Sequence, residues 1–435
     1  MDLGQRSETV RRANLSAIVR VLHERGPLSR SELVTATGLT RSAIRGLVGE
    51  LAGAGLASEA AAVPLGTPGR PSPHVHLNPD GAVVLALEIA VDSIAAAIVG
   101  LGGRVLGEAR IERPRGHSGV DDVVTDLATL AAGLRLRRPA ADPLIGVGVA
   151  VVGVVRRQDG LVSMAPNLGW TDVPLGARLA RALAVTVPIF VGNEADLGVL
   201  AEHRRGAAIG VDDVLFVSGE VGVGGGVISG GLPLTGAAGY AGEIGHMPVN
   251  PDGSRCSCGA IGCWETEVGE GALLALAGRS PDAGRAGVEA TLADAAAGSP
   301  VAISALDHIG RWLGFGLAGL VNVFNPRIIV LGGQFGRIHP FVRESLEDAL
   351  ARHSLAAPLA LVRIVPAILG EDAPLLGAAE LGFEPLLADP ASWVKPRDGA
   401  IQLATAGTRT SAVTPTRIAP EPGDQDEGVL PIVVA

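Results

Sequence analysis

The chain has 435 residues, which at about 150 residues per domain predicts roughly three folding units and excludes a single small module. Hydrophobic residues make up 47% and charged residues 18%, a composition that excludes a wholly disordered protein. The longest uncharged run, Val221 to Gly242, is rich in glycine, and no apolar stretch reaches the ~20 residues that cross a membrane. Residues 1–12 are polar, so we expect no secretory signal and a cytoplasmic protein.

The net charge of -10 argues against a surface that binds nucleic acid all over. The charge is uneven, because residues 1–80 contain nine arginines against seven acidic residues. This asymmetry predicts a small, mildly basic module attached to a larger acidic body.

The first 80 residues have the pattern of a helix-turn-helix. Apolar residues repeat at helical spacing between Ala13 and Arg25, and a Gly-Pro pair follows. Ser29 and Glu32 form a capping-box pattern that opens a second helix, which we expect to end near Thr37. After a turn at Gly38-Leu39, Thr40 can cap a third helix. The apolar stripe of that helix consists of Ile44, Leu47, Val48 and Leu51.

The opposite face of the third helix is polar and suits DNA. Residues 66–77, where alternating Val75 and Leu77 follow Gly-Arg-Pro, predict the wing of a winged variant. An ordinary solvent-exposed helix face is the plainer alternative, but the turn, the caps and the wing together favour DNA binding. The residues expected to contact DNA are Thr40, Arg41, Ser42, Arg45 and Arg70.

From residue 81 the pattern changes to α/β. Strands are expected over 83–89, 93–99 and within 145–155, and a second strand pair over 214–217 and 227–229 resembles a repeat of the first. A long helix over 304–322 and a strand over 327–331 follow. We therefore predict a DNA-binding domain at 1–80, a two-lobed α/β domain at 81–387, and a low-complexity tail at 388–435 that we expect to be disordered.

All three cysteines of the chain lie within eight positions, shortly after a histidine. Cys256, Cys258 and Cys263 with His246 would complete a tetrahedral zinc shell, and the glycines at 259 and 262 would let the loop turn around the ion. Reduced structural cysteines are the alternative. Because four protein ligands leave no open position, such a Zn²⁺ would be structural.

The segment Ala241-Gly242-Glu243-Ile244-Gly245-His246 and the cysteine run through Cys263-Trp264-Glu265 resemble the signature of the ROK family of sugar kinases and sugar-responsive repressors. The resemblance covers residues 10–385. It implies an actin-like fold in which two α/β lobes close on a sugar. The sugar-contacting positions that it implies are Asn167, Asn193, Glu194, Glu243, His246 and Glu265.

Each of these residues also has a plainer interpretation. Asn193 is a good helix N-cap, with Glu194 and Asp196 as acids in the first turn. Glu243 and Glu265 alone would be surface acids. Carboxylates and amides are nevertheless the groups that pair with sugar hydroxyls in fixed directions.

Three departures from the family's kinase pattern argue against phosphoryl transfer. Where a kinase of the family has Asp-x-Gly-Gly-Thr, residues 88–92 read Glu-Ile-Ala-Val-Asp, which blocks the backbone approach to phosphate. The second phosphate loop begins with Glu220-Val221 where Gly-Thr is expected, and a carboxylate there would repel phosphate. Glu194 replaces the catalytic aspartate, and a displacement of ~1 Å at the reacting centre can cost ~100-fold in rate.

The sequence therefore favours a sugar-responsive DNA-binding transcriptional regulator, a repressor, without catalytic residues. An active ATP-dependent sugar kinase with an added helix-turn-helix is the alternative, and a zinc-stabilised scaffold that binds another protein is a third. The partners implied are duplex DNA with an inverted-repeat operator, a sugar or sugar-phosphate effector, and a second copy of the chain in a homodimer or homotetramer.

Overall fold

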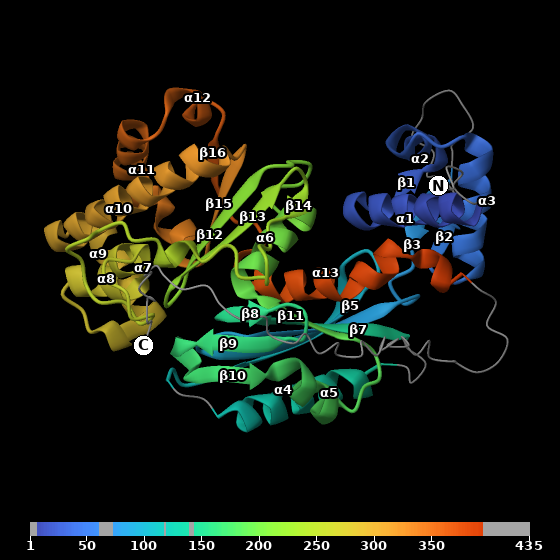
Figure 1. Ribbon diagram of the computed structural model, residues 1–435, viewed down its shortest axis with the longest axis horizontal. Helices are drawn as coiled ribbons and strands as arrows, with labels where there is room; N and C mark the ends of the chain where they lie inside the picture. Colours follow the sequence, from blue (N-terminus) through green and yellow to red (C-terminus); the bar gives the residue numbers. More distant parts are fainter. Residues whose placement is uncertain (1–6, 61–72, 117–118, 139–142, 395–435) are drawn as a thin grey trace, which may run out of the picture. The chain divides into compact units, whose positions relative to one another are not determined.

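The computed structural model describes residues 7–60, 73–116, 119–138 and 143–394 (Figure 1). Its N-terminal part contains α1 (Ser7–Arg25), α2 (Arg30–Thr37) and α3 (Arg41–Gly53). A small antiparallel sheet in the order β1-β3-β2 completes it, with β1 Leu28–Ser29, β2 Ala57–Ala60 and β3 His74–Leu77. This arrangement is the helix-turn-helix with a small sheet expected from the sequence, although α1 begins six residues earlier than its apolar pattern. Of the wing expected over 66–77, residues 66–72 lie outside the described residues, and the rest contains β3.

Local capping explains where these helices begin. The Ser29 hydroxyl accepts a hydrogen bond from the backbone N–H of Glu32, and the Glu32 carboxylate accepts one from the backbone N–H of Ser29. Thr40 accepts from the N–H of Ala43 at the start of α3. Gly38 ends α2 with φ 70°, a left-handed conformation that favours glycine. Both predicted caps are confirmed.

The first lobe is built on a five-stranded sheet in the order β11-β7-β4-β5-β6. Strands β4 and β5 pair antiparallel, as do β5 and β6, whereas β7 and β11 run parallel to β4. Its strands are β4 Val83–Ile89, β5 Ser93–Gly100, β6 Arg104–Glu112, β7 Leu144–Val151 and β11 Ile189–Asn193; its helices are α4 Val120–Leu136, α5 Leu175–Leu183 and α6 Glu194–Arg205. A small sheet of β8 (Val154–Arg156), β9 (Leu161–Ala165) and β10 (Trp170–Pro174) is added to it.

The second lobe repeats the same strand order. Its sheet runs β14-β13-β12-β15-β16, with β12 and β13 antiparallel and β15 and β16 parallel to β12. The strands are β12 Val214–Gly219, β13 Val223–Ser229, β14 Leu232–Pro233, β15 Ile328–Gly332 and β16 Arg363–Pro366. The helices are α7 Trp264–Val268, α8 Glu270–Leu276, α9 Gly284–Ala296, α10 Pro300–Phe324, α11 Gly333–His353, α12 Ala356–Leu359 and α13 Ala373–Ala388. The predicted duplication is therefore present.

The two lobes exchange helices. Helix α6, which follows the last strand of the first sheet, lies against β12 and β13 of the second, whereas α13 lies against β4 and β7 of the first, and the two helices pack together. Glycines allow this close approach, because a Cβ on Gly148 would lie 1.8 Å from the Ala378 carbonyl oxygen and one on Gly377 would lie 1.9 Å from that of Leu197. Any side chain at either position would separate a helix from its neighbour.

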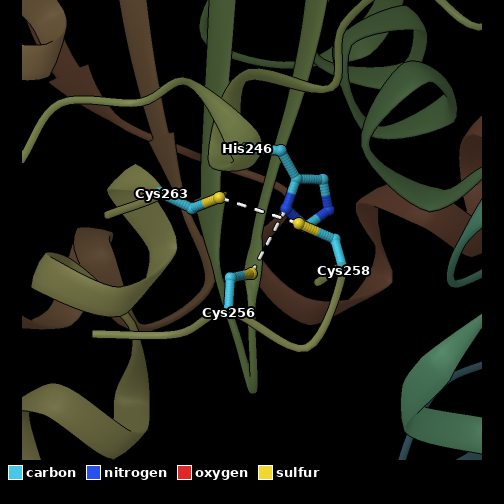
Figure 2. A group of neighbouring side chains, drawn as sticks. All are labelled: His246, Cys256, Cys258 and Cys263. Carbon is cyan, nitrogen blue, oxygen red and sulfur yellow. Dashed lines mark hydrogen bonds between the residues drawn. The ribbon is translucent and has the colours of Figure 1, made fainter. Parts of the chain in front are cut away.

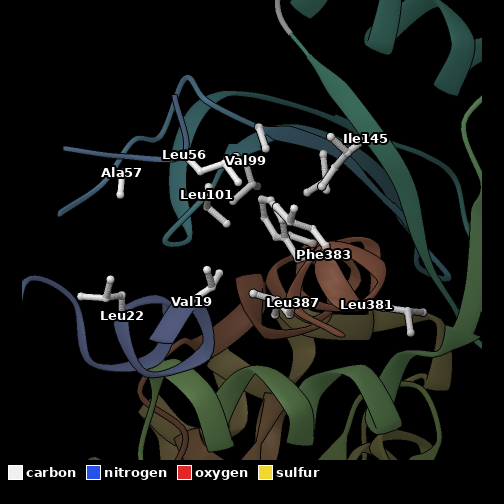
Figure 3. Close-up of a cluster of buried hydrophobic side chains, with 14 of the residues drawn as sticks. Val19, Leu22, Leu56, Ala57, Val99, Leu101, Ile145, Leu381, Phe383 and Leu387 are labelled. Atoms are coloured by element: carbon white, nitrogen blue, oxygen red, sulfur yellow. The ribbon is translucent and has the colours of Figure 1, made fainter. Parts of the chain in front are cut away.

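The N-terminal module shares a hydrophobic core with the first lobe. Figure 3 shows Val19 of α1 beside Leu387 of α13. Leu22 of α1, Val99 of β5 and Leu101, just after β5, belong to the same cluster. The folded part of the chain continues beyond residue 387, the end of the α/β domain predicted from the sequence. Pro390–Ser392 forms a 3₁₀-helix in which Pro390 and Ala391 are buried. Residues 388–394, assigned to the disordered tail from composition, are folded because their apolar side chains join this core; residues 395–435 lie outside the described part.

Within the described ranges, none of the helices is both long and apolar enough to traverse a bilayer.

Candidate functional site

The histidine and the three cysteines converge on one point, as Figure 2 shows. The ligand atoms of His246, Cys256, Cys258 and Cys263 all lie within 4.8 Å of one another. Cys256 Sγ is 3.6 Å from His246 Nδ1, and Cys258 Sγ is 3.7 Å from Cys263 Sγ. Four such atoms about 2.0–2.3 Å from a shared tetrahedral centre would be separated by roughly 3.5–3.8 Å. The residues therefore fit a four-coordinate metal ion.

The loop folds in this way because two of its glycines adopt positive φ. Gly259 has φ 95° and Gly262 has φ 69°. A Cβ on Gly262 would lie 1.6 Å from the Asn250 carbonyl oxygen, so the loop could not close over a larger residue. The backbone N–H of Trp264 donates to the Met247 carbonyl, which places Cys263 beside the turn that carries His246.

All six residues expected to bind a sugar line one pocket between the lobes. Asn167 comes from the 3₁₀-helix Pro166–Leu168, Asn193 and Glu194 from the β11–α6 junction, and Glu243, His246 and Glu265 from the segments around the metal centre. His246 Nδ1 faces the cysteines, so its ring joins the metal centre to the pocket wall. The structure thus brings together residues spread over about a hundred positions of the sequence.

Asn193 has the capping role that the plainer interpretation gave it. Its Oδ1 accepts hydrogen bonds from the backbone N–H groups of Ala195 and Asp196 at 2.7 and 3.2 Å, and its Nδ2 donates to the Gly153 carbonyl at 2.9 Å. The cap fixes the start of α6 at the pocket. Glu194, the first residue of that helix, therefore has a fixed backbone position there.

Glu265 is positioned by a neighbouring glycine. Its Oε2 accepts a hydrogen bond from the backbone N–H of Val223 at 3.1 Å. A Cβ on Gly222 would lie only 2.3 Å from the same oxygen. Glycine at this position of the turn therefore leaves the space that the Glu265 carboxylate occupies.

Burial and mutual repulsion make the carboxylates of the pocket weak acids. Burial, followed by the charges of Glu220 and Glu88, raises the pKa of Glu194 to about 8. Burial likewise raises the pKa of Asp196 to about 7, although Arg157 opposes the shift, and it raises that of Glu243. Glu194 thus retains a proton at neutral pH and can donate as well as accept a hydrogen bond.

Acidic side chains surround the two turns at which a kinase would hold phosphate. Both turns, one after β4 and one after β12, line an adjoining pocket together with Glu194. Burial raises the pKa of Glu88 to about 7, although Arg110 lies 3.0 Å from its Oε2, and burial also raises that of Glu220 to about 7. Asp92 and Glu371 add two more carboxylates to the walls, and each has an arginine partner, Arg115 at 3.0 Å and Arg285 at 2.6 Å. Because carboxylates outnumber the two lining arginines, Arg110 and Arg285, the balance of charge at these turns opposes the binding of a nucleoside triphosphate.

The candidate DNA face has the expected exposure. Arg41, Ser42 and Arg45 are exposed on α3, and the Ser42 hydroxyl lies 3.1 Å from that of Thr40. Among the described residues, Arg41 and Arg45 have no ion-pair partner, so both guanidinium groups are available to DNA. Arg70 lies outside the described residues.

The sequence did not single out two further polar residues. Ser257, between two of the cysteines, lines the pocket, and Asp196 is half-buried; besides burial, Arg157 lowers its pKa and Glu243 raises it. The sequence pattern indicates only a first-turn acid at 196, and no local signal distinguishes a half-buried acid from an exposed one.

Comparison with known proteins identifies the family. A model described as the ROK family matches residues 84–384. The xylose repressor of Bacillus subtilis is 27% identical over 388 residues, which covers 89% of this chain and 99% of the repressor. The glucokinase of Streptomyces coelicolor is 30% identical over 324 residues, which covers 70% of this chain and 98% of the kinase. A solved ROK family transcriptional regulator, a homologue of the E. coli MLC protein, has a TM-score of 0.70 at 26% identity and covers 88% of this chain and 97% of that one. Because the family model spans well over half of the sequence, this chain belongs to the ROK family.

Proposed function

We propose that the protein is a transcriptional repressor that binds duplex DNA through its winged helix-turn-helix and responds to a sugar bound between its ROK lobes. The observation that carries the proposal is the acidic lining of both phosphate turns beside an intact polar pocket. A pocket of this kind can bind a sugar but is poorly suited to a nucleotide. The similarity to repressors, which extends over the N-terminal module, supports the same conclusion.

The effector that suits this pocket is a neutral, unphosphorylated sugar. Four glutamates line it, Glu194, Glu220, Glu243 and Glu265, and neither lysine nor arginine occurs among its described lining residues. A phosphate group would meet carboxylates on both sides and no cation. Sugar hydroxyls, by contrast, can donate to ionised carboxylates and accept from the protonated Glu194 and from Asn167 or Asn193. D-xylose is the first sugar to test, because a relative is a xylose repressor.

The metal would be a structural zinc ion held by His246 Nδ1 and the three cysteine Sγ atoms. Three thiolates and one imidazole are a donor set that Zn²⁺ favours, and four protein ligands leave no position for a reacting water. The ion would fix the ring of His246 with Nε2 free to contact the sugar. It would also hold the segments that carry Glu243 and Glu265.

The kinase alternative remains relevant because of the similarity to a glucokinase. In that case Glu194 would act as the base toward the sugar hydroxyl. The proposal instead gives Glu194 a binding role, since a carboxyl group with a pKa of about 8 is mostly protonated at pH 7 and since the turns beside it are acidic.

One pair of assays tests the proposal. The purified chain should retard a duplex taken from the region upstream of its own coding sequence, as a homodimer or homotetramer on an inverted repeat, and D-xylose or another neutral sugar of a panel should change that affinity. Under the same conditions, a coupled assay should detect no sugar-dependent ADP release. Turnover of ~1 per second or faster, without DNA binding, would instead establish the kinase.

A further inference from the structure

Helix α6 begins at the candidate sugar pocket and ends at the DNA-binding module. Its 12 residues, Glu194–Arg205, extend over roughly 18 Å at the usual rise of 1.5 Å per residue. The first residue and its cap line the candidate sugar pocket. The last two residues, Arg204 and Arg205, reach the DNA-binding module and α13. One rigid element therefore joins the pocket to the module.

The contacts at the far end form a buried polar network. Glu380 of α13 accepts hydrogen bonds from Arg204 at 2.9 Å and from Arg205, and it lies 3.0 Å from His23 Nε2 of α1. His23 and Glu380 are each only 1% exposed. We call these four residues, His23, Arg204, Arg205 and Glu380, the junction network.

The contacts of His23 with backbone and carboxylate fix its tautomer. The backbone N–H of Gly102 donates to His23 Nδ1 at 3.1 Å, so the ring proton is on Nε2, which donates to Glu380 Oε2 at 3.0 Å. Arg205 Nη2 also lies 2.6 Å from Nε2, but both atoms are donors in this tautomer, so the two groups are neighbours and not hydrogen-bond partners. Arg205 also donates to the carbonyl oxygens of Gly102 at 3.0 Å and of His23 at 3.3 Å. Arg205 thus contacts α1, α13 and the turn after β5 at once. Three elements can be displaced together by one side chain.

Helix α6 is closely packed along its length. A Cβ on Gly226 of β13 would lie 2.6 Å from the Ala195 carbonyl oxygen, and the Gly377 contact described above presses α13 against the same helix. Near the C-terminal end, Glu202 is fully buried and accepts from the backbone N–H groups of Leu369 and Ala207 at 2.8 and 2.7 Å. Because closely packed elements shift as units, we expect a shift at the capped end to reach the arginines.

We propose that α6 couples the two functions: sugar binding at Asn193 and Glu194 moves the helix, and the junction network passes the movement to α1 and so to the DNA-binding face. This inference rests on the proposed function, since it requires that the pocket bind a sugar and the module bind DNA. It adds the route between them, and it gives Arg205 a positioning role without contact to either ligand.

The test measures the ratio of operator Kd values with and without saturating D-xylose, or another sugar that shifts the wild-type gel. A ratio of about 5- to 150-fold is the usual scale for wild type. Arg205→Lys keeps the positive charge but loses the planar guanidinium group that contacts α1, α13 and the turn after β5. We therefore expect the ratio of operator Kd values for this variant to fall to within about 2-fold of unity. Its sugar Kd and its sugar-free operator Kd should each stay within about 3-fold of wild type.

Arg12→Ala is the matched control. Arg12 also joins α1 to the body, through Asp389 at 3.0 Å, but among the described residues it has no hydrogen bond or ion pair with α6. This variant should keep the wild-type ratio. A folded Arg205→Lys protein that binds both ligands and keeps the full ratio would refute the inference while leaving the proposed function intact. A wild-type chain that responds to no sugar would refute both.

A second variant and a second measurement keep the test decisive if Arg205→Lys fails to fold. The double variant Arg205→Met, Glu380→Gln removes one charge of each sign, so no new net charge is buried, and it should show the same loss of coupling. Hydrogen exchange on wild type needs no variant at all. Addition of the sugar should change protection at the C-terminal ends of both α6 and α1, and a change confined to the pocket would overturn the inference.

Discussion

Replacement of Gly222 by alanine should weaken sugar binding without affecting DNA binding. Gly222 does not have the positive φ that would exclude alanine, so the perturbation is the added methyl group alone. That carbon would lie 2.3 Å from Glu265 Oε2. The carboxylate must move by about 1 Å to reach ordinary contact, and it then leaves both the Val223 N–H and the pocket wall. A hydrogen bond to a charged group contributes about 1.5–3 kcal/mol, which corresponds to an increase in sugar Kd of about 10- to 150-fold.

Calorimetry with the sugar that shifts the wild-type gel measures this change directly. Gly319→Ala is the matched control, because Gly319 is exposed in α10 and a Cβ there meets no atom within 4 Å. It should leave the sugar Kd unchanged and add slightly to stability, since alanine favours a helix over glycine by ~0.5–1 kcal/mol. Zinc content is measured in both proteins, because Cys256 Sγ lies 3.7 Å from Glu265 Oε1. A folded, zinc-containing Gly222→Ala protein with the wild-type sugar Kd would show that Glu265 does not contact the sugar.

Four further outcomes follow from the same structure. Metal analysis should find one zinc per chain, and Cys258→Ser should lose both the metal and the sugar response; full occupancy in that variant would contradict the assigned ligands. Because the pKa of Glu194 is raised to about 8, the folded chain holds a proton that the unfolded chain releases near pH 4.5, so stability should fall as pH rises from about 5 to 8. Glu194→Gln should flatten part of that decline in Tm, and an unchanged slope would contradict the assignment. Arg45→Ala should weaken operator binding by about 1–3 kcal/mol if Arg45 contacts a base edge, and a footprint without any protected inverted repeat would argue against DNA recognition by α3. Finally, ATP should not be consumed with any sugar of the panel, which the ADP-release assay checks.

Features whose residues are close in the sequence could be predicted. The capping box of Ser29 and Glu32 spans three positions, and the metal cluster spans fewer than twenty. In both cases the spacing itself brings the groups together. The duplicated strand pairs could also be recognised, because alternating apolar residues and glycine-bearing turns recur in the same order.

The junction network could not be predicted. His23 and Glu380 are separated by 357 positions, and each lies on an otherwise ordinary helix. The acids in the first turn of α6 show a related limit. Their pattern is that of a capped helix, and the cap is present, but the pattern does not indicate that Glu194 lines a pocket between two lobes or that Asp196 is half-buried. The junction network and the surroundings of these acids both depend on packing between residues that are far apart in the sequence.

The core shared by α1 and α13 constrains how regulators of this design can diverge in operator preference. Substitutions on the exposed side of α3 can alter which bases are contacted without altering any buried surface. The inward face of α1 has no such freedom, since Leu15, Ile18, Val19 and Leu22 are buried in a cluster that includes Phe383 and Leu387. A chimera that transplants a whole foreign helix-turn-helix would therefore bring a mismatched α1 to the α13 surface. Grafting only the exposed residues of α3 would keep the native packing of α1 on α13 and would change only which operator is bound.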